Sequence, residues 1–317
     1  MSSVPHFSGP RLTWPELPPG VRDGVERLLG SGVVEWESQV GGFSPGTADR
    51  VVTASGGRAF VKAVGAELNP DTPRLHRREA AISAQLPSSP HLPRLLGMYD
   101  DGIWIALVLE DVPGRHPRTP WLPHDLDLVL RGLSDVSVHL SGTRMRGLPR
   151  AVDEFAHDLA GWERVIADPP DDLDPWAARR LPRLVRAARF GLASMDGQAV
   201  VHCDLRADNI LIRDDDTVVF VDWPWASTGA PWLDRLFLLL NVNFFGGHDI
   251  EELVDVYLHD VPPTQVTGVI AGLAGYFVDV ARRPAPDGIP TLRGFQRAQG
   301  EAALRWLAAR SSSGLTR

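Results

Sequence analysis

The chain has 317 residues, which suits one large domain or two fused ones, and 44% of them are hydrophobic, enough for a buried interior. Its net charge of −8 argues against non-specific nucleic-acid binding, and a single cysteine, Cys203, excludes an intrachain disulfide and a multi-cysteine zinc site. The chain starts without a basic or strongly apolar stretch, and its most apolar run, residues 236–240, is far shorter than the roughly 18 residues of a membrane span. We therefore expect a cytoplasmic protein that binds neither nucleic acid nor a membrane.

The first third of the chain predicts a small antiparallel sheet. Residues 1–17 are rich in proline and lack periodicity, which indicates an irregular lead-in. The apolar spacing then predicts a helix over 20–29. Five strands are expected, over 33–40, 50–54, 58–64, 95–99 and 103–109. One helix, 72–86, follows the third strand, and Asp71 can cap it. The short connections make the strands antiparallel.

Beyond residue 120 the pattern becomes mostly helical. Helices are predicted over 125–140, 151–167, 175–195, 231–244, 250–259, 263–282 and 291–309. The one clear β signal in this part is a hairpin with strands over 210–213 and 217–221. We thus expect an α+β fold of two lobes. Residues 1–110 form a five-stranded lobe with one helix, 111–120 a linker, and 121–317 a large helical lobe that includes the hairpin.

Three oxygen-bearing side chains are ordered around this hairpin. Asp204 precedes it, Asn209 stands at its start, and Asp222 stands at its end. One carboxylate can take the proton of a hydroxyl, while a second carboxylate and an amide can hold Mg²⁺ against nucleotide phosphates. The pattern therefore indicates phosphoryl transfer. The alternative is structural, with His202 as a satisfied histidine, Asp208 and Asn209 as turn residues and Asp222 as a strand-end cap. Even in the functional interpretation, His202 has a supporting role.

Lys62 is the only lysine among the 32 basic residues. A genome with biased codon use explains why nearly all basic residues are arginine. It does not explain the one lysine, which is expected where a compact point charge is needed and a wide guanidinium would not fit. Seventeen residues later, Glu79 lies on the predicted helix 72–86. A strand lysine paired with a helix glutamate can hold the α- and β-phosphates of a nucleotide. The alternative is an ordinary edge-strand lysine.

A glycine-rich turn over residues 41–46 includes Gly42, Phe43 and Ser44. Glycine lets backbone N–H groups approach a phosphate closely, although such a run is often an ordinary turn. Thr47 and Ala48 follow where a Walker A loop requires lysine and then serine or threonine, so the turn is not of that type.

Together these motifs resemble the aminoglycoside phosphotransferase and choline kinase-type enzymes, which share the protein-kinase-like fold. The resemblance spans roughly residues 30–310. It rests on Gly41-Gly, Lys62, Glu79, His202-x-Asp204-x-x-x-x-Asn209, Asp222-Trp223, Gly229-x-Pro231 and Asp234.

The resemblance implies a role for each of these residues. Asp204 would be the general base, and Asn209 and Asp222 the ligands of Mg²⁺. Lys62 would clamp the phosphates of ATP or GTP, with Glu79 orienting it. Further roles are implied at the periphery of the site: the hinge residues Glu110 and Val112 would meet the nucleobase, and Asp234 would brace the catalytic loop.

Several positions depart from the family pattern. Cys203 stands where the family commonly has glycine, and it is either a buried small residue or an oxidisable thiol beside Asp204. Arg206 occupies the place of a lysine in Ser/Thr protein kinases, and it either stabilises transition-state charge or pairs with Asp208. The segment from Asp222 to the next helix is too short for the activation loop of a protein kinase.

Features of the helical lobe bear on the acceptor. Acidic side chains cluster over 153–174 and again over 249–260. Each cluster is either a solvated helix face or an acceptor site for a cation. Trp223, Trp225 and Trp232 either stack on a substrate ring or belong to the core. We expect an ATP- or GTP-dependent O-phosphotransferase acting on a small molecule such as an aminoglycoside, another antibiotic, an amino alcohol or a sugar. The alternative is a catalytically weak, nucleotide-binding regulatory protein.

Overall fold

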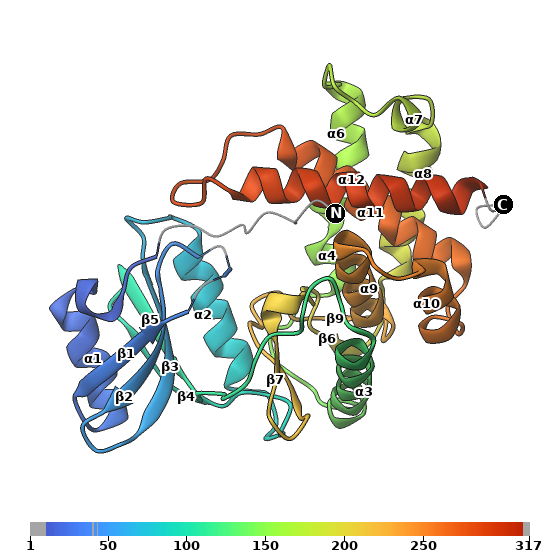
Figure 1. Ribbon diagram of the computed structural model, residues 1–317. Helices are drawn as coiled ribbons and strands as arrows, with labels where there is room; N and C mark the ends of the chain where they lie inside the picture. The colour runs from blue at the N-terminus through green and yellow to red at the C-terminus, as the bar shows by residue number, and fades with distance from the viewer. Residues whose placement is uncertain (1–10, 40, 43, 313–317) are drawn as a thin grey trace. The chain divides into compact units, whose positions relative to one another are not determined.

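The computed structural model describes residues 11–39, 41–42 and 44–312, which form two compact units (Figure 1). The first unit takes in the chain up to Pro117, Asp208–Trp225 and Ala285–Leu292. The second takes in Arg118–Ala207, Ala226–Pro284 and the chain from Arg293 onward. The chain therefore alternates between the units, whereas the sequence predicts a single boundary over residues 111–120.

The first unit is built on a five-stranded antiparallel sheet in the order β1-β2-β3-β5-β4. Its strands are β1 (Val33–Ser38), β2 (Thr47–Thr53), β3 (Arg58–Gly65), β4 (Leu95–Asp100) and β5 (Trp104–Leu109). Helix α1 (Pro19–Leu29) precedes the sheet, and α2 (Thr72–Ser83) lies between β3 and β4 in the chain. The predicted antiparallel lobe with one helix after its third strand is confirmed. Lys62 on β3 is in register with Ala48 on β2 and Leu107 on β5.

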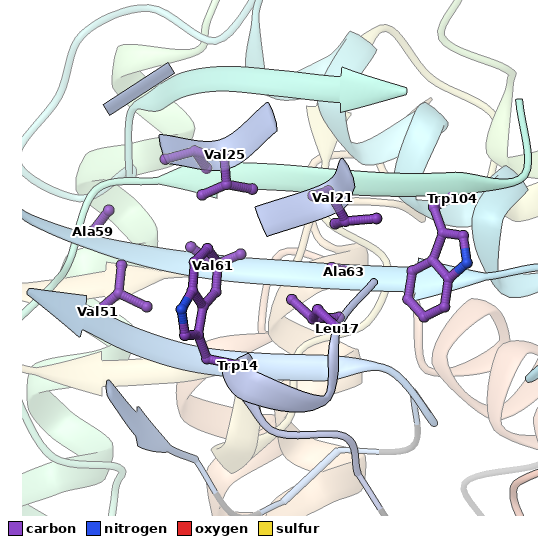
Figure 2. Packing of buried hydrophobic residues seen from close by; sticks show 11 residues of the cluster. Trp14, Leu17, Val21, Val25, Val51, Ala59, Val61, Ala63 and Trp104 are labelled. Atoms are coloured by element: carbon purple, nitrogen blue, oxygen red, sulfur yellow. The ribbon is translucent and has the colours of Figure 1, made fainter. Parts of the chain in front are cut away.

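Side chains alternate between the two faces of the sheet, and each face has its own core. On one face, Val21 and Val25 of α1 pack with Trp14 and Leu17 against β2, β3 and β5 (Figure 2). On the other face, α2 contributes to a smaller cluster of Val64, Ala80, Ile105, Leu107 and Leu109. Residues 1–10 of the predicted lead-in lie outside the described residues. The rest of it is ordered: Trp14–Glu16 form a 3₁₀ turn, η1, and Trp14 is buried.

Helix α2 starts as predicted, but a different residue caps it. The side chain of Asp71 makes no capping hydrogen bond. Instead, Oδ1 of Asn69 accepts hydrogen bonds from the backbone N–H groups of Asp71 and Thr72, each with a donor–acceptor distance of 3.0 Å. Asn69 is also tied to the distant segment Ala285–Leu292, because its Nδ2 donates to the Asp287 carbonyl over 2.9 Å. That second contact explains why the cap falls two residues earlier than the local sequence suggests.

The hairpin of β7 (Ile210–Ile212) and β8 (Val218–Phe220) groups with the first unit rather than with the helical one. Its outer backbone groups bond to segments of that unit. Arg115 and Ile212 exchange two backbone hydrogen bonds of 3.0 and 2.8 Å, and Phe220 N–H donates to the carbonyl of His91. These partners are far away in sequence, so the local pattern does not reveal them.

The second unit is mainly helical. Its longer helices are α3 (Pro123–His139), α8 (Leu181–Ser194), α9 (Leu233–Phe245), α10 (Ile250–Tyr257), α11 (Pro263–Ala281) and α12 (Leu292–Ser312). The predicted helix 151–167 is divided into α4 (Ala151–Glu154), α5 (Ala156–Leu159) and α6 (Gly161–Ala167). The predicted helix 175–195 is likewise divided into α7 (Pro175–Ala178) and α8. A two-stranded ladder of β6 (Ala199–Val201) and β9 (Ser227–Gly229), which the sequence did not predict, directly precedes the loop that begins at His202.

Helix α11 is the centre of the second unit. It is long and apolar enough to cross a membrane by length and composition, the one such helix in the described part of the chain. However, 61% of its most apolar window is buried inside the structure. It packs so closely on α8 that a Cβ added to Gly191 would lie 2.1 Å from the carbonyl carbon of Gly268. Its apolar character thus matches a core helix.

Candidate active site

Lys62 is the centre of the site residues in the first unit. Its Nζ lies 2.9 and 3.0 Å from the two carboxylate oxygens of Glu79 and 2.6 Å from Oδ1 of Asp222. An ammonium group has three N–H donors, so these contacts engage all of them. Glu79 reaches the lysine because it lies on the buried face of α2, one turn after His76.

Burial and pairing act in opposite directions on this triad. Burial alone would lower the pKa of Lys62, but Asp222 and Glu79 outweigh it and raise that pKa, so the ammonium stays charged. Burial raises the pKa of Glu79 to about 7, although Lys62 opposes the shift. Burial, followed by Lys62, lowers the pKa of His76 to about 3, so that imidazole stays neutral. The triad therefore presents one fixed cation.

The β7–β8 hairpin brings Asn209 and Asp222 together. Asn209 directly precedes β7 and Asp222 follows shortly after β8, and Ile210 is in register with Phe220. Val221 N–H then donates to the carbonyl of Asn209 over 3.0 Å, which extends the ladder by one step. Asp222 has a φ of 69°, in the left-handed region that residues with a side chain seldom adopt. Such conformations concentrate at functional sites.

The donor chemistry of Asn209 and Asp222 fits Mg²⁺. This ion prefers hard oxygen ligands, is often bound through only one or two carboxylates, and keeps several waters. Asp222 supplies a carboxylate and Asn209 an amide oxygen from the same end of one hairpin. Over residues 11–39, 41–42 and 44–312, no group of three or more His, Cys, Asp and Glu side chains is placed to hold a metal ion.

The glycine-rich turn is described at Gly41, Gly42 and Ser44, whereas Phe43 lies outside the described residues. Gly41 has a φ of 101° and Gly42 a φ of 72°, which only glycine adopts readily. Among the described residues, the buried hydroxyl of Ser44 has no hydrogen-bond partner. A buried hydroxyl without a partner costs free energy, so Ser44 is suited to bind a ligand oxygen.

The predicted hinge follows β5. The backbone N–H of Glu110 donates to the carbonyl of Arg94 over 2.9 Å, and its carboxylate pairs with the side chains of Arg94 and Arg213. The neighbouring Asp111 pairs with Arg50 and Arg58. Val112 is buried. Glu110 is therefore held by both its side chain and its N–H.

The catalytic-loop residues lie in the second unit. The backbone N–H groups of His202 and Cys203 donate to the two carboxylate oxygens of Asp234 over 2.8 and 2.9 Å. The N–H of Asp204 donates to Nδ1 of His202 over 3.2 Å. Nη1 of Arg206 lies 2.7 and 2.9 Å from the carboxylate oxygens of Asp204. Arg206 thus pairs with Asp204 within the second unit.

A carboxyl held on a rigid loop, with a lysine and a pair of oxygen ligands elsewhere in the chain, is the residue set of a phosphoryl-transfer enzyme. The model of the APH phosphotransferase enzyme family matches residues 41–267, more than half of the sequence. The chain belongs to the phosphotransferase enzyme family. It is a small-molecule kinase with the protein-kinase-like fold that the sequence predicted.

Solved structures share the fold of this phosphotransferase at low sequence identity. A thermostable mutant of aminoglycoside phosphotransferase APH(4)-Ia in its apo form is 12% identical, with a TM-score of 0.60 over 92% of this chain and 99% of that one. An aminoglycoside phosphotransferase from Alicyclobacillus acidocaldarius subsp. acidocaldarius DSM 446 is 15% identical, with a TM-score of 0.52 over 89% and 92%. APH(2'')-IIa, in a ternary complex with streptomycin and ATP, is 13% identical, with a TM-score of 0.56 over 83% and 90%. No curated protein matches the sequence.

Cys203 of the phosphotransferase is a buried small residue. Its side chain is enclosed, and burial, followed by the nearby charge of Asp234, raises the pKa of its thiol well above the ordinary value. A buried thiol with a raised pKa is a poor nucleophile and oxidises slowly. Its φ of 66° is left-handed, which explains why the related motif commonly has glycine here.

The three tryptophans near Asp222 are mostly core. Trp223 is 2% exposed and its Nε1 donates to the carbonyl of Phe220, while Trp232 is 8% exposed. Trp225 is partly exposed, and the guanidinium of Arg78 lies 5.6 Å from its ring centroid. The structure therefore favours the core interpretation for Trp223 and Trp232.

Many residues of the two acidic clusters serve the fold. Asp174 and Asp249 cap α7 and α10. Others form ion pairs with arginine: Glu163 with Arg189, Asp168 with Arg282, Asp172 with Arg297, Glu251 with Arg310 and Asp260 with Arg235. These members of the clusters therefore have structural partners, as expected for solvated helix faces.

Two residues of the sites escaped the sequence analysis. Asn241 is buried on the apolar helix α9, and its Oδ1 accepts hydrogen bonds from Ala207 N–H and from Trp121 Nε1. A lone amide on a leucine-rich helix is a usable signal, because a buried amide needs partners. Arg11 approaches the glycine-rich turn, and nothing in the local sequence marks it.

Proposed function

We propose that this phosphotransferase moves the γ-phosphoryl group of ATP or GTP to a hydroxyl of a small molecule. The observation that carries the proposal is the triad in which Lys62 pairs with both Glu79 and Asp222. Phosphoryl transfer requires little covalent chemistry from the protein. It depends on positioning the two substrates and on neutralising the charge of the phosphates. A fixed cation beside an oxygen-ligand pair supplies both.

In this proposal Lys62 binds the phosphate chain. Because its three donors are engaged in the triad, one carboxylate contact must give way to a phosphate oxygen. Asp222 is the partner released, since its side chain is 36% exposed whereas that of Glu79 is 3% exposed. Asn209 and Asp222 then hold Mg²⁺, which when bound neutralises charge on the β- and γ-phosphates. Ser44 and the N–H groups of the glycine-rich turn bind phosphate oxygens.

The hinge binds the nucleobase through its backbone. The N–H of Glu110 is committed to Arg94, so the Glu110 carbonyl and the Val112 N–H are the groups we assign to the base edge. A nucleotide donor is supported by structural neighbours solved with ADP, with AMP-PNP and with ATP. Comparing ATP with GTP in the assay below decides between the two donors.

Asp204 acts as the general base that accepts the proton of the acceptor hydroxyl. Asp234 fixes the residues that precede Asp204, because it accepts hydrogen bonds from the N–H groups of His202 and Cys203. Arg206 holds the carboxylate of Asp204 and places a cation where charge develops during transfer.

The acceptor is a small hydroxylated molecule, and an amine on it is favoured. Structural neighbours solved with hygromycin B and with streptomycin support an acceptor of this kind. Burial raises the pKa of Asp158, a residue of the first acidic cluster. Burial raises the pKa of Tyr276 to about 12, and the charges of Asp158 and Asp204 add to the shift. Arg293 opposes the shift. We propose that the two carboxylates near Tyr276 attract the amine of a cationic acceptor.

The proposal is tested by an acceptor screen with γ-labelled ATP and GTP in the presence of Mg²⁺. The panel covers aminoglycosides, other antibiotics, choline-like amines, homoserine and sugars. With the acceptor found, Asp204→Asn should lower kcat by about 10²–10⁴-fold and leave nucleotide affinity unchanged. Asp127→Asn, at an exposed aspartate of α3 paired with Arg131, is the matched control and should keep full activity.

Two outcomes contradict the proposal. If Asp204→Asn keeps most of its activity, Asp204 is not the base. If the protein binds Mg-nucleotide but phosphorylates no acceptor on the panel, the alternative of a nucleotide-binding regulatory protein is favoured.

A further inference from the structure

The segment before α1 is fixed against the sheet, and this determines where Arg11 lies. Trp14 and Leu17 insert into the core formed with α1 (Figure 2). The hydroxyl of Thr47, the first residue of β2, donates to the carbonyl of Leu12 over 2.9 Å. Thr47 comes directly after the glycine-rich turn, so the chain at Leu12 is tied to the end of that turn.

The guanidinium of Arg11 lies under the glycine-rich turn. Its Nη2 donates to the carbonyl of Gly41. A Cβ added to Gly42 would lie 2.7 Å from the same nitrogen, so the turn closes over the guanidinium. Within the part of the chain that the structure describes, the buried Nε atom has no hydrogen-bond partner and Arg11 forms no ion pair. One backbone carbonyl is thus its single hydrogen-bond partner in the described chain.

Arg11 is thus a partly buried cation that forms no ion pair with the described residues. Burial lowers the pKa of Arg11, and the charges of Asp222, Asp49 and Asp208 oppose the shift. An arginine remains charged under these conditions, and a desolvated charge is costly unless an anion binds it. Guanidinium groups recognise phosphate oxygens through several parallel N–H donors. The hydroxyl of Ser44, on the same turn, is a second buried group without a partner.

We propose that Arg11 is a further phosphate-binding residue, which contacts the terminal phosphates of the nucleotide from beneath the glycine-rich turn. The inference rests on the proposed function, since it needs a nucleotide bound beside Lys62. It adds a cation from outside the motifs of the kinase-like lobe. It also gives the segment that precedes α1 a binding role. The charge of Asp222, the proposed Mg²⁺ ligand in the same unit, acts on Arg11, so we place Arg11 beside the β- and γ-phosphates whose charge the ion would neutralise.

The test compares Arg11→Gln with wild type by calorimetric titration with Mg-ATP, Mg-ADP and AMP. Loss of a charge-assisted contact should weaken ATP and ADP binding about tenfold or more and leave AMP binding unchanged. Arg11→Lys should recover part of the loss, because it restores the charge without the planar fork. Arg22→Gln is the matched control: Arg22 lies on α1 and also has a buried Nε without a partner.

Thermal unfolding separates a binding role from a structural one. The ligand-free Arg11→Gln protein should unfold within a degree or two of wild type, and it should gain less Tm from saturating Mg-ATP. If the variant binds ATP as tightly as wild type or more tightly, Arg11 does not bind phosphate, although the proposed function stands. A variant that unfolds early with unchanged ATP affinity makes Arg11 a structural partner of Asp49 and also overturns the inference. If wild type binds no nucleotide, the proposed function itself fails.

Discussion

Cys203 holds a backbone conformation that most side chains disfavour. Its φ of 66° lies in the left-handed region, which costs a residue with a Cβ about 1 kcal/mol relative to glycine. The fold imposes this conformation because Asp234 binds the N–H groups of both His202 and Cys203. The strain therefore falls on the residue directly before Asp204.

We predict that Cys203→Gly is more stable than Cys203→Ala by about 1 kcal/mol, because glycine adopts this φ without strain. Both variants lose the buried thiol, so their difference combines the relief of backbone strain with the loss of one buried methyl group. Urea unfolding followed by circular dichroism measures it. Ala226→Gly, at a fully buried position without a positive φ, should instead lose stability. An alanine variant as stable as the glycine variant would show that Cys203 is not strained.

We predict that the raised pKa of Glu79 gives nucleotide binding a pH dependence. Its raised pKa of about 7 means that the carboxylate is mostly protonated at pH 6 and ionised at pH 8. The protonated form no longer holds the ammonium of Lys62, so the KM for ATP should rise up to about tenfold between pH 8 and pH 6. In Glu79→Gln the KM should be high and nearly flat, apart from the ionisation of ATP itself. Equal pH profiles for the two proteins would contradict this assignment.

At the scale of elements, glycines set the spacing of the helices around α11. Gly191 of α8 meets Gly268 of α11 backbone to backbone, and Gly161 of α6 meets Gly275 in the same way. In both pairs an added Cβ would lie within 2.6 Å of backbone atoms of α11. These helices lie so close that no side chain separates them at the contact points.

Gly191→Ala should therefore lower the free energy of unfolding by about 3 kcal/mol, although alanine is the better helix former. The neighbouring group is backbone and cannot move aside without shifting a helix. Denaturant titration measures the loss. Gly20→Ala on α1 is the control, because its Cβ would meet only Tyr99 Oη at 3.7 Å, and it should be neutral or stabilising by up to about 1 kcal/mol. A neutral Gly191→Ala would mean that α8 and α11 can separate at little cost.

At the scale of the whole molecule, local patterns in the sequence predict the elements better than their grouping. Alternation predicts the strands of the sheet, and apolar spacing predicts α1, α3 and α9 to α12. The grouping of the β7–β8 hairpin is not predictable in this way, since it depends on backbone bonds to His91 and Arg115. The breaks at Phe155 and Ala160 in the predicted helix 151–167 are not predictable from the sequence either. The apolar spacing continues across them, so it does not reveal where the chain changes direction.

The residues of the candidate site also divide into those that local patterns predict and those that depend on distant contacts. Lys62, Glu79, Asn209 and Asp222 are predictable because strand, helix and hairpin bring them together at fixed spacing. Arg11 is not, because its position depends on Trp14 and Leu17 filling a core made by distant strands. The pairing of Arg206 with Asp204 also depends on rotamer and burial, which sequence spacing does not determine.

The single lysine makes the molecule a one-site substrate for lysine-specific proteolysis. An endoprotease that cleaves after lysine has one target, the bond between Lys62 and Ala63. This bond lies inside β3, which is hydrogen-bonded to β2 on one side and β5 on the other. Cleavage therefore requires β3 to leave the sheet. The rate at which fragments 1–62 and 63–317 appear then measures how often the sheet opens at β3. Because ligand binding stabilises the closed sheet, the rate of this single cut at rising ATP concentrations also reports nucleotide affinity, without a label and without an acceptor.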